Sequence, residues 1–173
     1  VAIVMLGLSA AVMGTWVDRN GPRKAMFVSA LFWSGGFMVG ALGIFTGQLW
    51  LVYIGYGFLG GIGLGIGYIS PVSTLIKWFP DRPGLATGMA IMGFGGGALI
   101  ASPLSSALLA FYDPDSGTDG WVASGDAVGK LFVTLGIVYL IYMLYGAWTI
   151  RVPADDWKPK GFDPATVAKK PLV

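Results

Sequence analysis

The sequence predicts an all-α protein, a polytopic bundle of five membrane-spanning helices. Three observations favour this fold. Charged residues make up 12% of the 173 residues and apolar residues 55%, whereas a soluble domain carries roughly 25% charge. The charges are clustered, so that long segments have none. Glycine is abundant, with 28 residues, and it recurs at a spacing that lets helices pack closely.

Each predicted span is a segment without charge. A helix needs about 20 apolar residues to cross hydrocarbon ~30 Å thick. The charge-free run 25–76 is long enough for two spans, and the turn 46–48 separates them. The third and fourth spans are long, so we expect tilt or projection into water. Buried core helices of a soluble protein are the alternative, but uncharged runs of this length favour spans. The predicted spans are about 1–17, 25–45, 49–77, 84–111 and 130–150.

The basic residues predict the orientation. Ten of the eleven Lys and Arg lie in the loops 18–24 and 77–83 or in the C-terminal tail 151–173. The excess of Lys and Arg places these three segments in the cytoplasm. The tail has four Pro and mixed charge, which is typical of a linker or a disordered terminus. Because the chain would enter the membrane from outside at its first residue, we expect an earlier span and interpret the sequence as a fragment of a longer chain.

The composition excludes several kinds of chemistry. The sequence has no Cys and no His, which excludes a disulfide scaffold, a Cys/His zinc site and a Cys or His nucleophile. A net charge of +2 on so apolar a chain does not indicate nucleic-acid binding. The segment 55–60 matches G-x-G-x-x-G, but it lies inside an uncharged span rather than between a strand and a helix. We therefore predict no enzyme, catalytic residue, metal site or cofactor, and no nucleic-acid partner.

Small residues recur every four positions in the third and fourth spans. Such ridges allow helix backbones to approach closely. Two prolines in the same spans each remove a backbone hydrogen bond and can kink the helix. Static packing and helices that rock against each other both remain open as interpretations. The predicted packing or hinge residues are Gly57, Gly61, Gly65, Pro71, Gly93, Gly97, Ser102 and Pro103.

The most specific segment is the basic turn at 14–24. Asn20-Gly21 is a turn signal, and a loop facing the cytoplasm would explain the basic pair that follows. It would not explain Asp18 at a helix end or Gly14 one turn earlier. These residues fit the form G-x-x-x-D-R-x-G followed by two basic residues, with Pro22 shifting the pair by one position. The segment resembles the loop between the second and third helices of the major facilitator superfamily.

The basic turn and the stretch 77–88 resemble the oxalate/formate antiporter branch of that family. The resemblance covers helices two to six, and it implies part of the N-terminal six-helix half of a twelve-helix fold. It also implies a secondary active transporter of small organic anions, such as oxalate, formate or another carboxylate, by antiport or proton-coupled symport. The expected partners are the lipid bilayer, the anion and the remaining half of the same chain. We expect the plasma (inner) membrane of a bacterium or archaeon.

The resemblance further implies that the basic turn acts as a cytoplasmic latch. The glycine of the first helix would allow close approach to a helix of the other half. The aspartate would meet a helix N-terminus or a basic group there, and the cations would pair with acids or lipid phosphates. The latch residues are Gly14, Asp18, Arg19, Gly21, Arg23 and Lys24. One departure is Tyr56, which stands where the family often has an arginine.

The family lines its cargo cavity with helices that correspond to the first, third and fourth spans here. Tyr68 is the strongest candidate, because it follows a glycine-rich stretch and its hydroxyl can orient a carboxylate. An interface or packing role is the alternative for each tyrosine. No charge is predicted at mid-depth, so a carboxylate would need basic residues from the missing half. A carrier of a neutral solute or drug and a non-transporting scaffold or channel remain alternatives. The candidate cavity residues are Tyr53, Tyr56, Tyr68, Ser70, Ser73 and Thr74.

Overall fold

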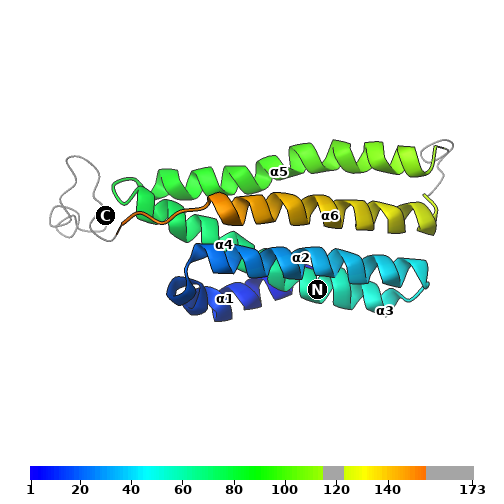
Figure 1. Ribbon diagram of the computed structural model, residues 1–173, viewed down its shortest axis with the longest axis horizontal. Helices are drawn as coiled ribbons and strands as arrows, with labels where there is room; N and C mark the ends of the chain where they lie inside the picture. The colour runs from blue at the N-terminus through cyan, green and yellow to red at the C-terminus, as the bar shows by residue number, and fades with distance from the viewer. Residues whose placement is uncertain (115–122, 155–173) are drawn as a thin grey trace.

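The computed structural model describes residues 1–114 and 123–154 (Figure 1). Within these residues the protein is helical and contains no strand. Five helical rods are long and apolar enough to cross a membrane, which confirms the predicted all-α class. The rods are α1 (Ala2–Asn20), α2 (Pro22–Phe45), the continuous rod of α3 (Leu49–Val52), η1 (Tyr53–Leu59) and α4 (Gly60–Trp78), α5 (Pro83–Tyr112) and α6 (Gly125–Thr149).

The helices extend beyond the uncharged segments of the sequence. The first helix runs to Asn20 and the second begins at Pro22, because charged residues are compatible with a helix outside the hydrocarbon. The last helix begins at Gly125, ahead of the predicted start at 130, because the Ser124 hydroxyl accepts a hydrogen bond from the Ala127 amide at 3.3 Å. Most of the predicted tail 151–173 lies outside the described residues, which end at 154.

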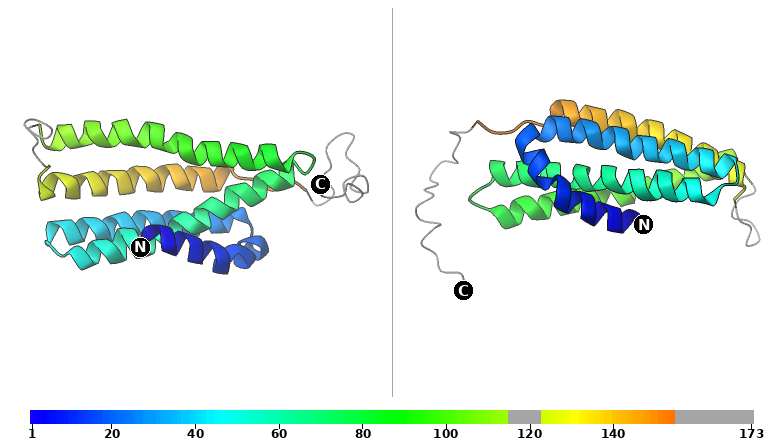
Figure 2. Two further views of the ribbon diagram at one scale, coloured as in Figure 1. Left: turned by 180° about the vertical axis from the view of Figure 1, so that it is seen from behind. Right: turned by 90° about the horizontal axis from the view of Figure 1, so that it is seen from below.

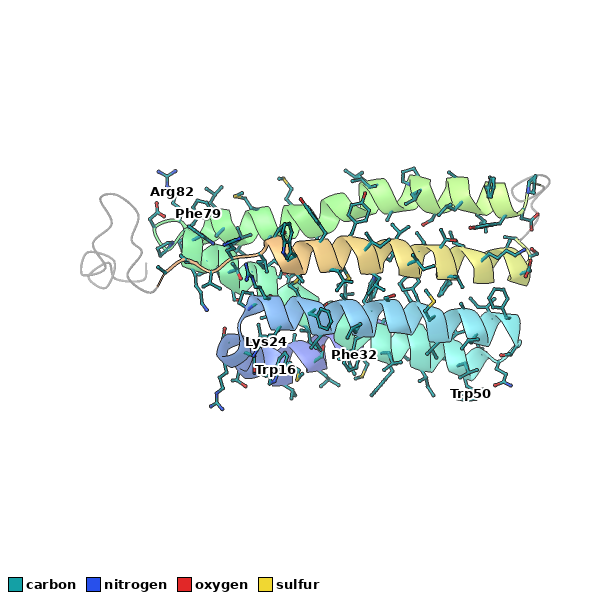
Figure 3. All side chains as sticks on the ribbon, in the orientation of Figure 1. Trp16, Lys24, Phe32, Trp50, Phe79 and Arg82 are labelled. Atoms are coloured by element: carbon teal, nitrogen blue, oxygen red, sulfur yellow. The ribbon has the colours of Figure 1, made fainter. Side chains whose placement is uncertain are left out.

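The rods form a bundle whose two basic connections lie at one end. Helix α2 packs against α4 and α6, α5 lies beside α6, and α4 crosses obliquely from α1 towards α5 (Figure 2). The α1–α2 turn, the α4–α5 turn and the end of α6 share one end of the bundle. Figure 3 shows Lys24 and Arg82 at that end and Trp50 at the opposite one. The structure therefore sorts the basic residues of the described connections as the charge pattern predicts.

Helix α2 and the π-helical segment η1 are in direct backbone contact. A Cβ atom built on Gly36 would lie 2.7 Å from the Gly55 carbonyl oxygen and 2.7 Å from the Gly60 nitrogen. A Cβ atom built on Gly55 would lie 2.5 Å from the Gly40 nitrogen. Apolar side chains give little preference for helix neighbours over lipid, whereas close backbones gain van der Waals contact. Glycine is therefore required where these two helices cross.

Further along, α4 presents glycine to two neighbours. Gly61 and Gly65 face α1, and a Cβ atom on Gly61 would lie 2.7 Å from the Ala2 carbonyl oxygen; Gly57, one turn earlier in η1, faces Val1. The second ridge faces α2, where a Cβ atom on Gly63 would lie 2.5 Å from the Trp33 nitrogen. Helix α4 is consequently held between α1 and α2, with little room for a side chain on either face.

Buried hydroxyl groups join the helices at three levels. Ser29 on α2 donates to the Gly63 carbonyl oxygen at 2.6 Å, and Ser34 donates to the Gly136 carbonyl oxygen of α6 at 2.8 Å. On α4, the Ser70 hydroxyl donates to the Pro22 carbonyl oxygen at 3.2 Å. Such bonds contribute about 0.6 kcal/mol on average between membrane helices. These hydrogen bonds fix the position of each helix along its neighbour, at contacts that glycine makes possible.

Adjacent glycines on α2 provide a matched test of the backbone contact. Gly36→Ala should destabilise the intact protein by about 1–3 kcal/mol, because the new methyl group would overpack the crossing. Gly35→Ala adds the same methyl group where no atom lies within 4 Å, so we expect it to be neutral or slightly stabilising. Thermal unfolding of both variants in detergent measures the difference. Equal melting temperatures would contradict the assignment of the crossing.

Candidate functional site

The basic turn reverses the chain over a single residue. Gly21 has φ +83° and ψ 158°, a region that side-chain-bearing residues rarely adopt. Its amide donates to the Val17 carbonyl oxygen at 3.0 Å and so closes α1. Pro22 then starts α2, at the helix position where a missing N–H costs nothing. The Asn20 side chain donates to the Trp16 carbonyl oxygen at 3.0 Å and braces the end of α1.

The turn is tied to the chain that follows α6. The Arg23 side chain donates from Nε to the Ile150 carbonyl oxygen at 3.0 Å. Nearby, the Trp78 indole at the end of α4 donates to the Arg151 carbonyl oxygen at 2.9 Å. Together with the bond from Ser70 to the start of α2, these contacts hold the ends of α2, α4 and α6 together. The sequence did not indicate this connection, because its acceptors are backbone carbonyls.

The other residues of the proposed latch face outward. A Cβ atom built on Gly14 would meet no atom within 4 Å, and Asp18, Arg19 and Lys24 are exposed. Within residues 1–114 and 123–154, Asp18 takes part in no ion pair. The family resemblance assigns the partners of Gly14 and Asp18 to the other half of the fold, which the described residues do not test. Their role in a latch therefore stays a prediction.

Two hollows of about 360 Å³ each adjoin along α4 and α5. Tyr68 and Phe94 line both of them, and their rings meet edge to face with centroids 5.7 Å apart. The first hollow extends to Ser29 and Trp33 on α2 and to Tyr139 on α6. The second reaches Pro71, Met89 and Gly93. Tyr68 thus lies where two spaces between helices adjoin.

The hollows exist because the facing side of α5 carries small residues. Gly93 and Gly97 line them, and a Cβ atom on either would meet nothing within 4 Å. The small residues of α5 therefore leave space, whereas those of α4 make backbone contact. Ser102 and Pro103 are exposed. Their predicted packing or hinge roles stay predictions.

The remaining candidate cavity residues lie in other surroundings. Tyr56 belongs to an aromatic cluster with Phe37 and Phe132, at centroid distances of 5.4 and 5.8 Å, and Tyr53 is 56% exposed. The hydroxyl groups of the other three donate to backbone carbonyl oxygens. Those three are Ser70, which bonds to Pro22, and Ser73 and Thr74, which both bond to Ser70. Of the six candidates, Tyr68 is the one that the structure places at both hollows.

Residues of α2 and α6 in the first hollow were missed by the sequence analysis. Cavity-lining residues were expected from the first, third and fourth spans, but Trp33 and Tyr139 also contribute, with ring centroids 6.1 Å apart. A signal existed for Trp33. It lies inside a span rather than at the membrane surface, where tryptophan usually serves as an anchor.

Comparison with known proteins gives relatives that are named as transporters or carriers. The antiporter named "Oxalate:formate antiporter" of Oxalobacter formigenes is 33% identical over 148 residues, which cover 85% of this chain and 31% of that protein. "Apicoplast pyruvate carrier 1" of Toxoplasma gondii is 32% identical over 117 residues, 57% of this chain and 21% of that protein. "Monocarboxylate transporter 9" of Rattus norvegicus is 29% identical over 108 residues, which cover 62% of this chain and 21% of that protein.

The matched segments cover from 21% to 31% of these relatives' own lengths. The family model described as Major Facilitator Superfamily matches residues 1–173. Its extent includes the basic turn, all five apolar rods and both hollows. The chain belongs to the major facilitator superfamily and forms part of one of its membrane helix bundles.

Proposed function

We propose that this chain is part of a secondary active transporter that carries small organic anions, such as oxalate, formate or another carboxylate. The observation that carries the proposal is the position of Tyr68 at the junction of two hollows between helices. The family and the relatives indicate a transporter rather than an enzyme. Three relatives are named for oxalate and formate, pyruvate, and monocarboxylates, so a carboxylate is the chemical class they share.

The phenol of Tyr68 suits this cargo. Its O–H can donate to a carboxylate oxygen, and a hydrogen bond to an ionised acceptor is stronger than one between neutral groups. The edge-to-face contact with Phe94 restricts the tilt of the Tyr68 ring. Each hollow, at about 360 Å³, is several times the ~30 Å³ share of one water molecule. A carboxylate of a few heavy atoms fits that volume.

The charge of such a cargo needs a cation that the lining of the two hollows does not supply. No Asp, Lys or Arg lines either hollow in the part of the chain that the structure describes. We propose that the other half of the same transporter supplies it, since substrate sites of such carriers lie between two repeats. Antiport and proton-coupled symport are both compatible with this arrangement.

In the proposed mechanism the basic turn acts as a latch on the cytoplasmic side. The end of the bundle that carries Lys24 and Arg82 would face the cytoplasm, in keeping with the excess of basic residues there. The membrane would be the plasma membrane of a bacterium or archaeon. Gly14 would allow a helix of the other half to approach, and Asp18 would meet its N-terminus or a basic group. Release of this contact would open the cavity towards the cytoplasm.

Counterflow through the intact transporter in proteoliposomes tests the function. Vesicles preloaded with oxalate, formate, lactate or a sugar should drive uptake of the same labelled compound only for the carboxylates. Counterflow with the sugar alone would favour a carrier of a neutral solute. The uncharged lining of both hollows is also compatible with a neutral solute. Downhill flux without counterflow would identify a channel.

Tyr68→Phe should weaken cargo binding while the protein still inserts. Loss of one hydrogen bond to a charged acceptor should raise the KM for the carboxylate about tenfold or more. The phenyl ring of the variant preserves the contact with Phe94. Tyr53→Phe is the matched control, since Tyr53 does not line either hollow. Initial rates of counterflow over a range of cargo concentrations measure the effect, and equal KM values for both variants would remove Tyr68 from the site.

Asp18→Asn tests the latch. The substitution keeps the size of the side chain but removes the charge that would favour a helix N-terminus or a basic group. We expect slower exchange with a cargo KM close to that of the parent protein. Asp81→Asn, in the other connection at this end, is the control. Exchange rates measured at saturating cargo decide the question, and an unchanged rate for Asp18→Asn would contradict the latch.

A further inference from the structure

The first hollow at Tyr68 is lined by two pairs of aromatic rings. On α4 and α5, the rings of Tyr68 and Phe94 meet edge to face with centroids 5.7 Å apart. On α2 and α6, the ring centroids of Trp33 and Tyr139 lie 6.1 Å apart. All four side chains line the hollow, and within residues 1–114 and 123–154 no ring contact joins one pair to the other. The hollow therefore separates the two pairs.

A larger aromatic cluster holds the pair on α2 and α6 in place. Phe37 is 5% exposed, and its ring centroid lies 5.1 Å from that of Trp33 and 5.5 Å from that of Tyr139. Tyr56 on η1 and Phe132 on α6 both contact Phe37 and so extend the cluster. Side chains packed among neighbours in this way stay in defined rotamers. The wall that α2 and α6 contribute is thus formed before any cargo enters.

The rest of the lining leaves room for a flat ring. Gly97, Ala98 and Ala101 of α5 also line the hollow, and a Cβ atom built on Gly97 would meet no atom within 4 Å. The volume of the hollow is about 360 Å³, whereas an apolar cavity of about 150 Å³ is enough for benzene. The described residues that line the second hollow alone include no aromatic side chain. An aromatic ring therefore suits the first hollow better than the second.

We propose that the cargo is an aromatic carboxylate and that its ring occupies the first hollow. This inference rests on the proposed function, in which the Tyr68 hydroxyl donates to the carboxylate. The ring would lie between Phe94 and the pair formed by Trp33 and Tyr139. Burial of an apolar ring is favourable in itself, and edge-to-face or offset contacts with other rings add to it. A cargo as small as formate would leave the aromatic walls without a partner.

The two parts of such a cargo have different surroundings. The carboxylate would stay at Tyr68, where the two hollows adjoin, because an unpaired charge among apolar walls is strongly disfavoured. The ring would extend from there towards α2 and α6. Trp33 and Tyr139 would consequently determine specificity for the ring, whereas the charge would be met by Tyr68 and by the cation that we assign to the other half of the transporter.

A matched pair of cargos tests the inference in proteoliposomes that contain the intact transporter. Lactate and β-phenyllactate share the carboxylate and the neighbouring hydroxyl, and they differ by one phenyl ring. In counterflow we expect β-phenyllactate to have a KM about tenfold or more below that of lactate, because its ring is buried. The diol in which a hydroxymethyl group replaces the carboxylate of β-phenyllactate keeps the ring without the charge, and it should drive no counterflow.

Two substitutions, each with a control on the same helix, test where the ring lies. Tyr139→Leu removes an aromatic wall and should bring the KM for β-phenyllactate closer to that for lactate. Tyr142→Leu is its control, since Tyr142 is 71% exposed and lines neither hollow at Tyr68. Gly97→Leu places a side chain in the hollow and should lower the kcat/KM of β-phenyllactate relative to that of lactate about tenfold or more. Gly95→Leu also has room for its side chain but lies outside both hollows, so it should keep that ratio.

The outcomes distinguish this inference from the proposed function. Counterflow of lactate, formate or oxalate without that of β-phenyllactate, or equal KM values for lactate and β-phenyllactate, would overturn the aromatic cargo and leave the proposed function standing. Counterflow with none of the carboxylates would overturn both. Equal losses of the kcat/KM ratio in Gly97→Leu and Gly95→Leu would remove the ring from the first hollow. Counterflow of the uncharged diol as fast as that of β-phenyllactate would contradict recognition of the carboxylate.

Discussion

Backbone contact between helices at glycine is the constraint on which the rest of this structure depends. Inside a membrane, burial of apolar side chains does little to hold helices together. Gly36, Gly55 and Gly63 compensate by bringing the backbones of α2, η1 and α4 into contact. Hydrogen bonds such as that from Ser29 to Gly63 form because the backbones are this close. The position of α4, and with it the depth of Tyr68, follows from this crossing.

The same kind of small residue has the opposite effect on α5. Gly93 and Gly97 meet no neighbouring atom in the space a side chain would occupy, and Ala86 is the one residue of α5 classed as buried. Helix α5 therefore leaves hollows against α4, whereas Gly61 and Gly63 of α4 are in close contact with α1 and α2. An α4 that carries Tyr68 and is in close contact with α1 and α2, beside an α5 that leaves space, is the arrangement from which we infer a cargo path. The basic turn is anchored at the far end by Arg23, so the helices are tied where the proposed latch would act.

The sequence predicted much of the fold because charge is expensive in hydrocarbon and uncharged runs therefore mark helices. The four-residue spacing also identified the ridges of α4. It could not assign a partner to each ridge, since periodicity describes one helix and Gly61 and Gly63 face different neighbours. The roles of the polar residues were harder to predict than the helix neighbours. A hydroxyl on a span suits either cargo or a neighbouring carbonyl, and only the fold shows that Ser70 bonds to Pro22 while Tyr68 lines the hollows. The hydrogen bond from Arg23 to Ile150 could not be predicted from the sequence, because its acceptor is a backbone carbonyl oxygen and every residue has one.

Protection of a single introduced thiol tests the cargo path most directly. This chain has no Cys, any Cys elsewhere in the intact transporter is first replaced by Ser, and Gly97 has room for a side chain and lines the first hollow. In the intact transporter, Gly97→Cys should react with a membrane-impermeant maleimide, and oxalate or another accepted carboxylate should slow that reaction. Gly95→Cys, on the same helix but outside both hollows, should react at a rate that cargo does not change. A Gly97→Cys rate that is the same with and without cargo would contradict a carboxylate path between α4 and α5.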